Sequence, residues 1–323
     1  MSERTDEFAW IDRLRPLTRN DGRALDLRDD TAVLSGRPGY DLVITKDAMV
    51  EGVHVLPGEA PEIIARRLLL TNLSDLAAKA AEPFGYFLMT AWPAHYDAAR
   101  REAFAQGLAV EGDRFGLSLL GGDTVSTPGP LTVSATMLGW APHGRAILRS
   151  GARAGDHLIV CGAIGDGWLG LQAAKGTRMR HAADLANHYR LPTPLLALRD
   201  ALRLAAHACA DVSDGLIADA VHIAEASRLG VELALDQIPL SEGGSEWLNN
   251  QTDRTASLVH LSAGGDDYAL ACAVSPEDSQ RFAVQVRALG VPVAEVGRMT
   301  AAPGLKVTVD GAIVVPESTG WRH

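Results

Sequence analysis

The feature that most constrains this chain is the position of its aspartates. Most of them fall at the ends of apolar runs and are flanked by Gly, Ser, Thr or Asn. Short carboxylates on tight backbone are what hard, oxygen-preferring cations such as Mg²⁺ require. So many of them in one chain predict several divalent ions that hold a polyphosphate, with the protein supplying position and charge compensation. The residues concerned are Asp29, Asp30, Asp47, Asp75, Asp123, Asp211, Asp214, Asp266 and Asp267.

Length and charge limit the fold and the ligand. The chain has 323 residues, 47% of them apolar and 22% charged, which is typical of a globular protein with two domains. Its net charge of −10 disfavours nonspecific binding to nucleic acid. An anionic ligand remains compatible with this charge because bound metal ions can invert the local potential.

The cysteines and the hydropathy pattern bear on the compartment. Cys161, Cys209 and Cys272 stand far apart in apolar or Ala-rich segments, and no CxxC or Cys/His ligand spacing occurs. We therefore expect buried reduced thiols, no zinc site and a cytoplasmic location. The charged segment 1–6 lacks the apolar core of a signal peptide. No apolar run approaches about 18 residues, so we expect no membrane span.

Strand and helix patterns predict α/β or α+β layering in each of two domains. In the first half we expect helices at 6–17, 61–81 and 97–115, and strands at 40–44, 117–120 and 131–138. A basic, Gly-containing segment at 144–156 indicates the boundary between domains 1–145 and 146–323. In the second half we expect strands at 157–161 and 268–274, helices beginning at Trp168 and spanning 215–227 and 276–289, and a hairpin at 306–315 that turns at Asp310-Gly311.

The helix expected at 61–81 is apolar on nearly every side, which predicts that it is buried. Asn72 and Asp75, three residues apart, share one of its faces. A buried carboxylate must be paired or bind a metal. Two interpretations of Asp75 remain open: a metal ligand, or a carboxylate that caps a loop or pairs with an arginine.

Two expected strand ends carry candidate ligand groups. Asp47 follows the strand at 40–44 and stands beside Thr45, while Gly121-Gly122-Asp123 follows the strand at 117–120. Glycines allow a phosphate or a metal to approach the backbone closely. The residues of both segments are also common in ordinary turns. Taken alone, each segment is more often a turn than a ligand site.

Similar segments occur in the second half. Asp211-Val212-Ser213-Asp214-Gly215 precedes an expected helix, and Ser213 or Asp214 is a credible N-cap. A cap needs one such side chain and this segment offers three, so Asp211 and Asp214 are also candidate metal ligands and Ser213 a candidate phosphate contact. Gly264-Gly265-Asp266-Asp267 fits either a turn or a ligand loop.

The segment 165–170 matches GxGxxG, the dinucleotide-binding fingerprint, after a strand and at a helix start. No second strand pattern follows within the ~30 residues that this motif needs. We therefore interpret the loop as close packing or phosphate approach. P-loop, protein-kinase, HExxH and GxSxG motifs do not occur, and a lone histidine such as His54 is usually structural or solvent-facing.

Taken together, the acidic segments resemble the thiamine-monophosphate kinase family. That family belongs to the superfamily of aminoimidazole-ribonucleotide synthetase and selenophosphate synthetase. The matching segments are RDDTAV at 28–33, TKDAMVEGVH at 45–54, NLSDLAA at 72–78, GGDT at 121–124, RSGARAGD at 149–156, DVSDGL at 211–216 and GGDDYAL at 264–270, with Trp321 as a weaker match. The resemblance covers nearly the whole chain, and the order of the NLSDLAA and DxSDG segments is specific.

The resemblance implies transfer of the γ-phosphoryl group of ATP to thiamine monophosphate, giving thiamine diphosphate. It also implies a homodimer in which the N-terminal domain pairs its sheet with the partner's, and a C-terminal α/β domain. The ligands implied for several Mg²⁺ ions are Asp30, Thr45, Asp47, Asp75, Asp123, Asp211 and Asp214. The implied ATP contacts are Gly122, Asp123, Arg149 and Ser213, and the implied thiamine monophosphate contacts are His54, Asp266 and Trp321.

The physical chemistry fits this implied reaction. The acceptor is a phosphate oxygen that is already anionic, so no strong general base is needed. The obstacle is the repulsion between two anions, which metal ions and an arginine offset while they hold the reacting atoms in line.

The chain departs from the usual pattern of the family at several sites. Arg28 replaces a usual Gly, Lys46 replaces a usual Thr beside the metal ligands, and Asp266 replaces a usual Glu. A related ATP-dependent synthetase and a non-catalytic nucleotide-binding relative therefore stay open as alternatives. A selenophosphate-type enzyme usually needs a reactive N-terminal Cys, and the first cysteine here is Cys161.

Overall fold

The computed structural model describes residues 7–321, which form two compact units. Within the described residues, unit 1 comprises 7–76 and 81–144, and unit 2 comprises 77–80 and 145–321. Position 6, the expected start of the first helix, and the segment 1–6 lie outside the described residues. No described helix is both long enough and apolar enough to cross a membrane.

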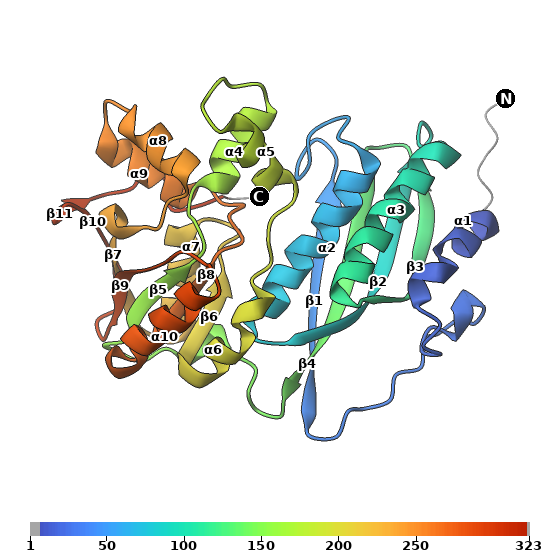
Figure 1. The fold of residues 1–323 in the computed structure, drawn as a ribbon, viewed down its shortest axis with the longest axis horizontal. Helices are drawn as coiled ribbons and strands as arrows, with labels where there is room; N and C mark the ends of the chain where they lie inside the picture. Colours follow the sequence, from blue (N-terminus) through green and yellow to red (C-terminus); the bar gives the residue numbers. More distant parts are fainter. Residues whose placement is uncertain (1–6, 322–323) are drawn as a thin grey trace. The chain divides into compact units, whose positions relative to one another are not determined.

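Unit 1 is a four-stranded sheet covered by two long helices on one face (Figure 1). The strands are β1 (Tyr40–Val50), β2 (Glu82–Pro93), β3 (Ser118–Thr127) and β4 (Thr132–Pro142), in the order β1-β4-β2-β3. Only β2 and β3 pair in parallel, and α3 (Ala98–Phe115) connects them. The second long helix is α2 (Pro61–Ala78), and α1 (Glu7–Leu14) precedes the sheet.

The prediction of a buried helix at 61–81 is confirmed. Leu68, Leu69, Leu73 and Leu76 of α2 are all completely buried, as expected of a helix that is apolar on nearly every side. The helix at 97–115 is also confirmed, and Asp97 caps it by accepting a hydrogen bond from the Arg100 N–H at 2.9 Å.

Two expectations about the strands of unit 1 were wrong. β1 continues to Val50, so Thr45 and Asp47 lie inside the strand rather than after it. β3 continues to Thr127, so the Gly121–Asp123 segment is strand rather than turn. β1 forms an edge of the sheet, and its side chains at positions 42, 44, 46 and 48 are exposed. The pairing of β1 with β4 and of β3 with β2 supplies the backbone partners that keep these polar segments extended.

Unit 2 is built on a seven-stranded mixed sheet. Its strands are β5 (His157–Cys161), β6 (Ala206–Asp211), β7 (Gly230–Ala234), β8 (Leu270–Val274), β9 (Val293–Thr300), β10 (Gly304–Val309) and β11 (Ala312–Val314), in the order β11-β10-β7-β9-β5-β8-β6. The helices are α4 (Asp166–Ala174), α5 (Ala182–Arg190), α6 (Arg199–Ala205), α7 (Leu216–Ala226), α8 (Glu242–Asn249), α9 (Arg254–Ala263) and α10 (Pro276–Ala288). The expected strand at 157–161 and the hairpin turning at Asp310-Gly311 are confirmed.

The central strands β5 and β8 of the unit 2 sheet are buried on both faces, whereas β10 and β11 at one edge are partly exposed. Leu158 and Val160 of β5 belong to the apolar cluster that includes α7, whereas Ile159 and Cys161 belong to the cluster that includes α6 and α10. All three cysteines are buried and free in this second cluster, as the sequence predicted. Alternate side chains of β5 therefore pack into two different apolar cores, which explains why a central strand is apolar along nearly its whole length.

Candidate active site

In unit 1, β1 and α2 bring two carboxylates together. The Thr45 hydroxyl donates a hydrogen bond to Asp75 Oδ2 at 2.5 Å, and the Asp47 N–H donates to Asn72 Oδ1 at 3.2 Å. The Asn72 amide in turn donates to the Leu68 carbonyl at 2.8 Å, which orients its side chain. Thr45 and Asp47 face α2 together because alternate side chains of a strand share one face.

The electrostatics of this cluster favour a bound cation. Burial, and then the negative charge of Asp75, raise the pKa of Asp47 to about 6, although a hydrogen bond with Thr71 opposes the shift. Two carboxylates at close range repel each other unless a proton or a cation lies between them. Because all the donors are hard oxygens, the set fits Mg²⁺. The interpretation of Asp75 as a metal ligand stays a prediction.

A second group of predicted residues lies on the opposite face of the same sheet. Asp30 and Asp123 line a hollow of about 430 Å³, together with Asp29 and Lys46. The strand register explains the placement of Asp123. Asp123 on β3 is aligned across the sheet with Met89 on β2, Ser134 on β4 and Ala48 on β1, and Ala48 lies two residues after Lys46 on the same face. The acidic residues of unit 1 thus form two groups rather than one.

Gly122 and His54 have clear structural roles. A Cβ on Gly122 would lie 1.9 Å from the Leu88 carbonyl oxygen, so only glycine allows β3 to approach β2 this closely. His54 follows β1, and its Nδ1 accepts a hydrogen bond from the Val50 N–H at 3.1 Å. These contacts account for both residues within unit 1 and leave their ligand contacts as predictions.

In unit 2, Ser213 and Asp214 do not cap the following helix. The N-cap of α7 is Gly215, and no side chain caps it. Instead the N–H groups of Ser213 and Asp214 both donate to Asp219 Oδ2 at 3.1 Å. The N-cap interpretation was therefore wrong. The Ser213–Asp214 segment is instead held by Asp219, a fully buried aspartate in the first turn of α7.

Asp219 and His222 were not among the residues predicted from the sequence. Together with Asp214 they form, in the part of the chain that the structure describes, a group whose ligand atoms all lie within 4.8 Å of one another. His222 Nδ1 lies 3.4 Å from Asp219 Oδ1, and this neighbour raises the pKa of His222, although burial and the charge of Arg149 oppose the shift. An acidic residue in the first turn followed three residues later by histidine was the available signal. Asp211 lies nearby in sequence, at the buried end of β6.

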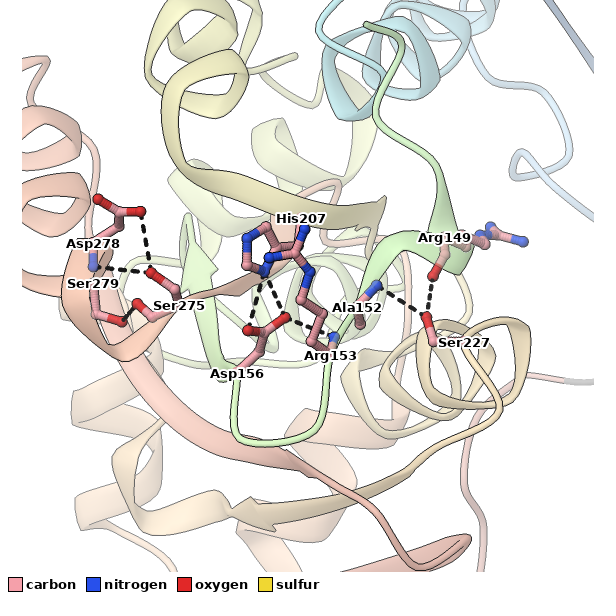
Figure 2. Close-up of polar contacts among 9 residues, drawn as sticks. All are labelled: Arg149, Ala152, Arg153, Asp156, His207, Ser227, Ser275, Asp278 and Ser279. Atoms are coloured by element: carbon pink, nitrogen blue, oxygen red, sulfur yellow. Dashed lines mark hydrogen bonds and ion pairs between the residues drawn. The ribbon is translucent and has the colours of Figure 1, made fainter. Parts of the chain in front are cut away.

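Backbone groups of the segment that contains Arg149 form hydrogen bonds that hold the segment in place (Figure 2). Its carbonyl accepts a hydrogen bond from the Ser227 hydroxyl at 2.9 Å, and that hydroxyl accepts one from the Ala152 N–H at 3.2 Å. Asp156 closes the same segment by accepting from the Arg153 N–H and contacting His207 Nδ1, both within 3.1 Å. Figure 2 shows the Arg149 side chain directed away from this network, so its guanidinium group takes no part in these hydrogen bonds.

Asp267 fixes the GxGxxG loop. Its buried carboxylate accepts hydrogen bonds from the N–H groups of Gly165 and Gly167 at 2.9 Å. A Cβ on Gly167 would lie 2.4 Å from the backbone of Asp266, which confirms the interpretation of close packing. β5 pairs antiparallel with both β8 and β9, so the parallel βαβ unit of a dinucleotide site does not form around this loop.

Asp266 and Trp321 each lie beside the 211–214 segment. The Asp266 N–H donates to the Ser213 carbonyl at 2.8 Å, and the Trp321 N–H donates to the Asp214 carbonyl at 2.9 Å. Trp321 remains 58% exposed and lines a hollow of about 680 Å³ together with Asp214 and His222. Unit 2 therefore gathers Ser213, Asp214, Asp266 and Trp321 through backbone contacts.

Comparison with known proteins identifies the family. Residues 28–141 match the family model of the AIR synthase related protein N-terminal domain, and residues 153–310 match that of the C-terminal domain. The chain is 55% identical to the thiamine-monophosphate kinase of Caulobacter vibrioides over 98% of this chain and 90% of that protein. It is 36% identical to the thiamine-monophosphate kinase of Salmonella typhimurium over 98% of both chains.

Solved structures agree with these relatives. The thiamine-monophosphate kinase of Stenotrophomonas maltophilia K279a superposes with a TM-score of 0.82 and 33% identity, covering 95% of this chain and 98% of that one. A structure described as AaThiL complexed with AMPPCP and TMP gives a TM-score of 0.77 and 26% identity, covering 97% and 96%. The resemblance seen in the sequence is therefore confirmed, and this chain belongs to the thiamine-monophosphate kinase family.

Proposed function

We propose that this chain phosphorylates thiamine monophosphate, with ATP as the phosphoryl donor and thiamine diphosphate as the product. The observation that carries the proposal is the Asp47–Asp75 pair with Thr45 beside it, in a chain 55% identical to a thiamine-monophosphate kinase. Two carboxylates held close together call for a counter-cation, and metal-assisted phosphoryl transfer uses such sites.

Magnesium is the cation that the donor oxygens fit best. When bound, it would supply positive charge to the phosphoryl oxygens of both substrates. The residues proposed to hold several such ions are Asp30, Thr45, Asp47, Asp75, Asp123, Asp211 and Asp214. The catalytic contribution falls on Asp30, Asp47, Asp75, Asp123 and Asp214.

The chain's own contribution is position. The hydrogen bond from Thr45 fixes the direction of the Asp75 carboxylate, and Asn72 fixes the backbone of Asp47. Carboxylates held in this way reduce the cost of aligning the donor and acceptor phosphates. No side chain has to remove a proton from the acceptor, because its phosphate oxygen is already ionised.

The remaining predicted residues are proposed to bind the two substrates. Gly122, Asp123, Arg149 and Ser213 are assigned to ATP, and His54, Asp266 and Trp321 to thiamine monophosphate. The exposed indole of Trp321 is suited to stack on the cationic thiazolium ring. In this assignment, domain 1–145 holds metal and nucleotide, and domain 146–323 completes both substrate sites.

The same proposal includes a homodimer and a cytoplasmic location. β1 lies at an edge of its sheet and exposes Leu42 by 40% and Ile44 by 58%. An open sheet edge with apolar side chains favours pairing with a second copy. Light scattering on the purified chain should give the mass of a dimer, and a monomer at micromolar concentration would contradict this part. The buried free thiols are compatible with a reducing compartment.

The activity test is direct. Purified protein incubated with ATP, Mg²⁺ and thiamine monophosphate should yield thiamine diphosphate and ADP in equal amounts, measured by chromatography. Chelation of the metal should abolish both products. ADP release without thiamine diphosphate would point to a related synthetase, and ATP binding by calorimetry without turnover would point to a non-catalytic relative.

A further inference from the structure

Lys46 occupies an unusual position for a cation. It projects from β1 between Thr45 and Asp47 but faces the other side of the sheet, since successive strand residues alternate. There it lines the hollow of about 430 Å³ together with Asp29, Asp30 and Asp123. The hollow thus combines three exposed carboxylates with one lysine.

The ammonium group of Lys46 does not form an ion pair with a carboxylate of the described residues. Its nearest polar partner is the Thr136 hydroxyl on the neighbouring strand, at 3.4 Å, a long hydrogen bond. Across residues 7–321, Lys46 forms no ion pair within 4 Å of a carboxylate oxygen. A lysine near acidic residues that does not pair with them is available to contact an anionic ligand.

The positive charge of Lys46 can offset the repulsion between a polyphosphate and the carboxylates of the hollow. A polyphosphate cannot approach three carboxylates unless cations neutralise both partners. A divalent ion would do this from solution, whereas Lys46 carries a fixed positive charge that is already in the hollow. Thr136 lines the same hollow, and its hydroxyl can form a further hydrogen bond there.

We propose that Lys46 is a built-in cation that contacts a phosphate of the nucleotide in this hollow and takes the place of one divalent ion. The inference rests on the proposed function for the identity of the nucleotide. It assigns to Lys46 a role in setting how many metal ions the nucleotide complex needs. The competing role is a charge that only discourages unwanted pairing of the edge strand β1.

The experiment counts bound metal. Mn²⁺ is titrated into the full chain saturated with AMPPCP, and bound ions are counted by electron paramagnetic resonance. Lys46→Thr supplies a hydroxyl in place of the charge and should bind one more Mn²⁺ per chain than the wild type. Lys46→Met supplies neither, and it should bind AMPPCP about tenfold more weakly by calorimetry, consistent with loss of one charge-assisted hydrogen bond. Lys46→Arg should keep the wild-type ion count.

Equal ion counts in the wild type and Lys46→Thr would overturn the proposal, as would unchanged AMPPCP affinity in Lys46→Met. Lys306→Thr, on β10 in unit 2, is the matched control, because it also removes one exposed lysine. Thermal unfolding of each variant separates these effects from misfolding. Thiamine diphosphate formation by the wild type is measured separately, so a chain that shows the predicted ion counts but no turnover would refute the proposed function and not this inference.

Discussion

The aspartates of the two units are neutralised in different ways. In unit 1, Asp47 and Asp75 lie close enough for the charge of Asp75 to raise the pKa of Asp47, and the Thr45 hydroxyl donates a hydrogen bond to Asp75. In unit 2, Asp219 and Asp267 each accept two backbone N–H groups and are almost completely buried. The first arrangement places two negative charges together, which a cation can balance, whereas backbone N–H groups satisfy the carboxylate of Asp267 within the protein.

Functional and structural carboxylates of one chain can therefore be told apart by the groups that surround them. A carboxylate that backbone N–H groups surround orders the loop that supplies them, as Asp267 orders Gly165 and Gly167. A carboxylate that faces another carboxylate destabilises the fold slightly until a cation binds. Substitution should therefore affect activity at the first kind of site and stability at the second.

The largest effect should come from Asp75→Asn. Because this change removes a proposed metal ligand, we expect kcat/KM for thiamine diphosphate formation to fall by about a thousandfold. Stability should be unchanged or slightly higher in chelator, because the repulsion with Asp47 is relieved. Steady-state kinetics and thermal unfolding provide the two measurements.

Asp113→Asn is the matched control for that variant, because Asp113 pairs with Arg19 on an exposed part of α3. It should keep wild-type kinetics. Turnover by Asp75→Asn within tenfold of the wild type would remove Asp75 from the metal site.

Asp267→Ala tests the other side of the comparison. Loss of the carboxylate leaves the buried N–H groups of Gly165 and Gly167 without acceptors, so the free energy of unfolding should fall by about 3 kcal/mol. Urea unfolding followed by circular dichroism measures the change. Asp267→Asn should lose less, because its amide oxygen can still accept. Equal stability of the alanine variant and the wild type would show that the loop does not depend on this carboxylate.

The pH dependence of stability should reveal the Asp47–Asp75 pair in the metal-free protein. The pKa of Asp47 is raised from 3.8 to about 6 in the fold, so the folded state holds its proton more tightly than the unfolded chain. The resulting stabilisation is fully present below the unfolded pKa and is lost as the pH rises through the folded pKa. In chelator, the free energy of unfolding should therefore decline between these two values.

Asp47→Asn should flatten this decline, since it removes the titrating group. Urea unfolding at a series of pH values gives both curves. The same slope in both proteins would show that Asp47 does not titrate in this range, and the metal-site interpretation would lose its electrostatic support.

The smallest effects should come from aspartates that only cap helices. Asp97 caps α3 in unit 1 and Asp253 caps α9 in unit 2, each by accepting a hydrogen bond at 2.9 Å. Alanine at either position should lower the free energy of unfolding by about 1 kcal/mol without a change in the Mn²⁺ count. A larger loss at one position would show that the two units differ in how much they depend on their helix ends.

Local sequence patterns predicted much of the fold. The burial of α2, the helix at 97–115 and the Asp310-Gly311 turn follow from apolar spacing and turn residues, which are properties of a few neighbouring residues. The patterns did not predict β2, although its Phe84, Tyr86, Phe87 and Trp92 are typical of a strand. Pro83, near the start of β2, lies beside a register shift in the pairing with β4.

The sequence by itself determined the family, the mixed α/β class and the aspartates worth testing, because these depend on residue identity and order. Only the tertiary structure decided which of them meet. Neighbouring strands extend β1 and β3 through their polar segments, and strand alternation then sends Asp47 and Lys46 to opposite faces. In the same way, Asp219 and Asp267 find their N–H partners in other segments of the chain. Such contacts depend on backbone pairing between distant segments, which no local pattern of residues contains.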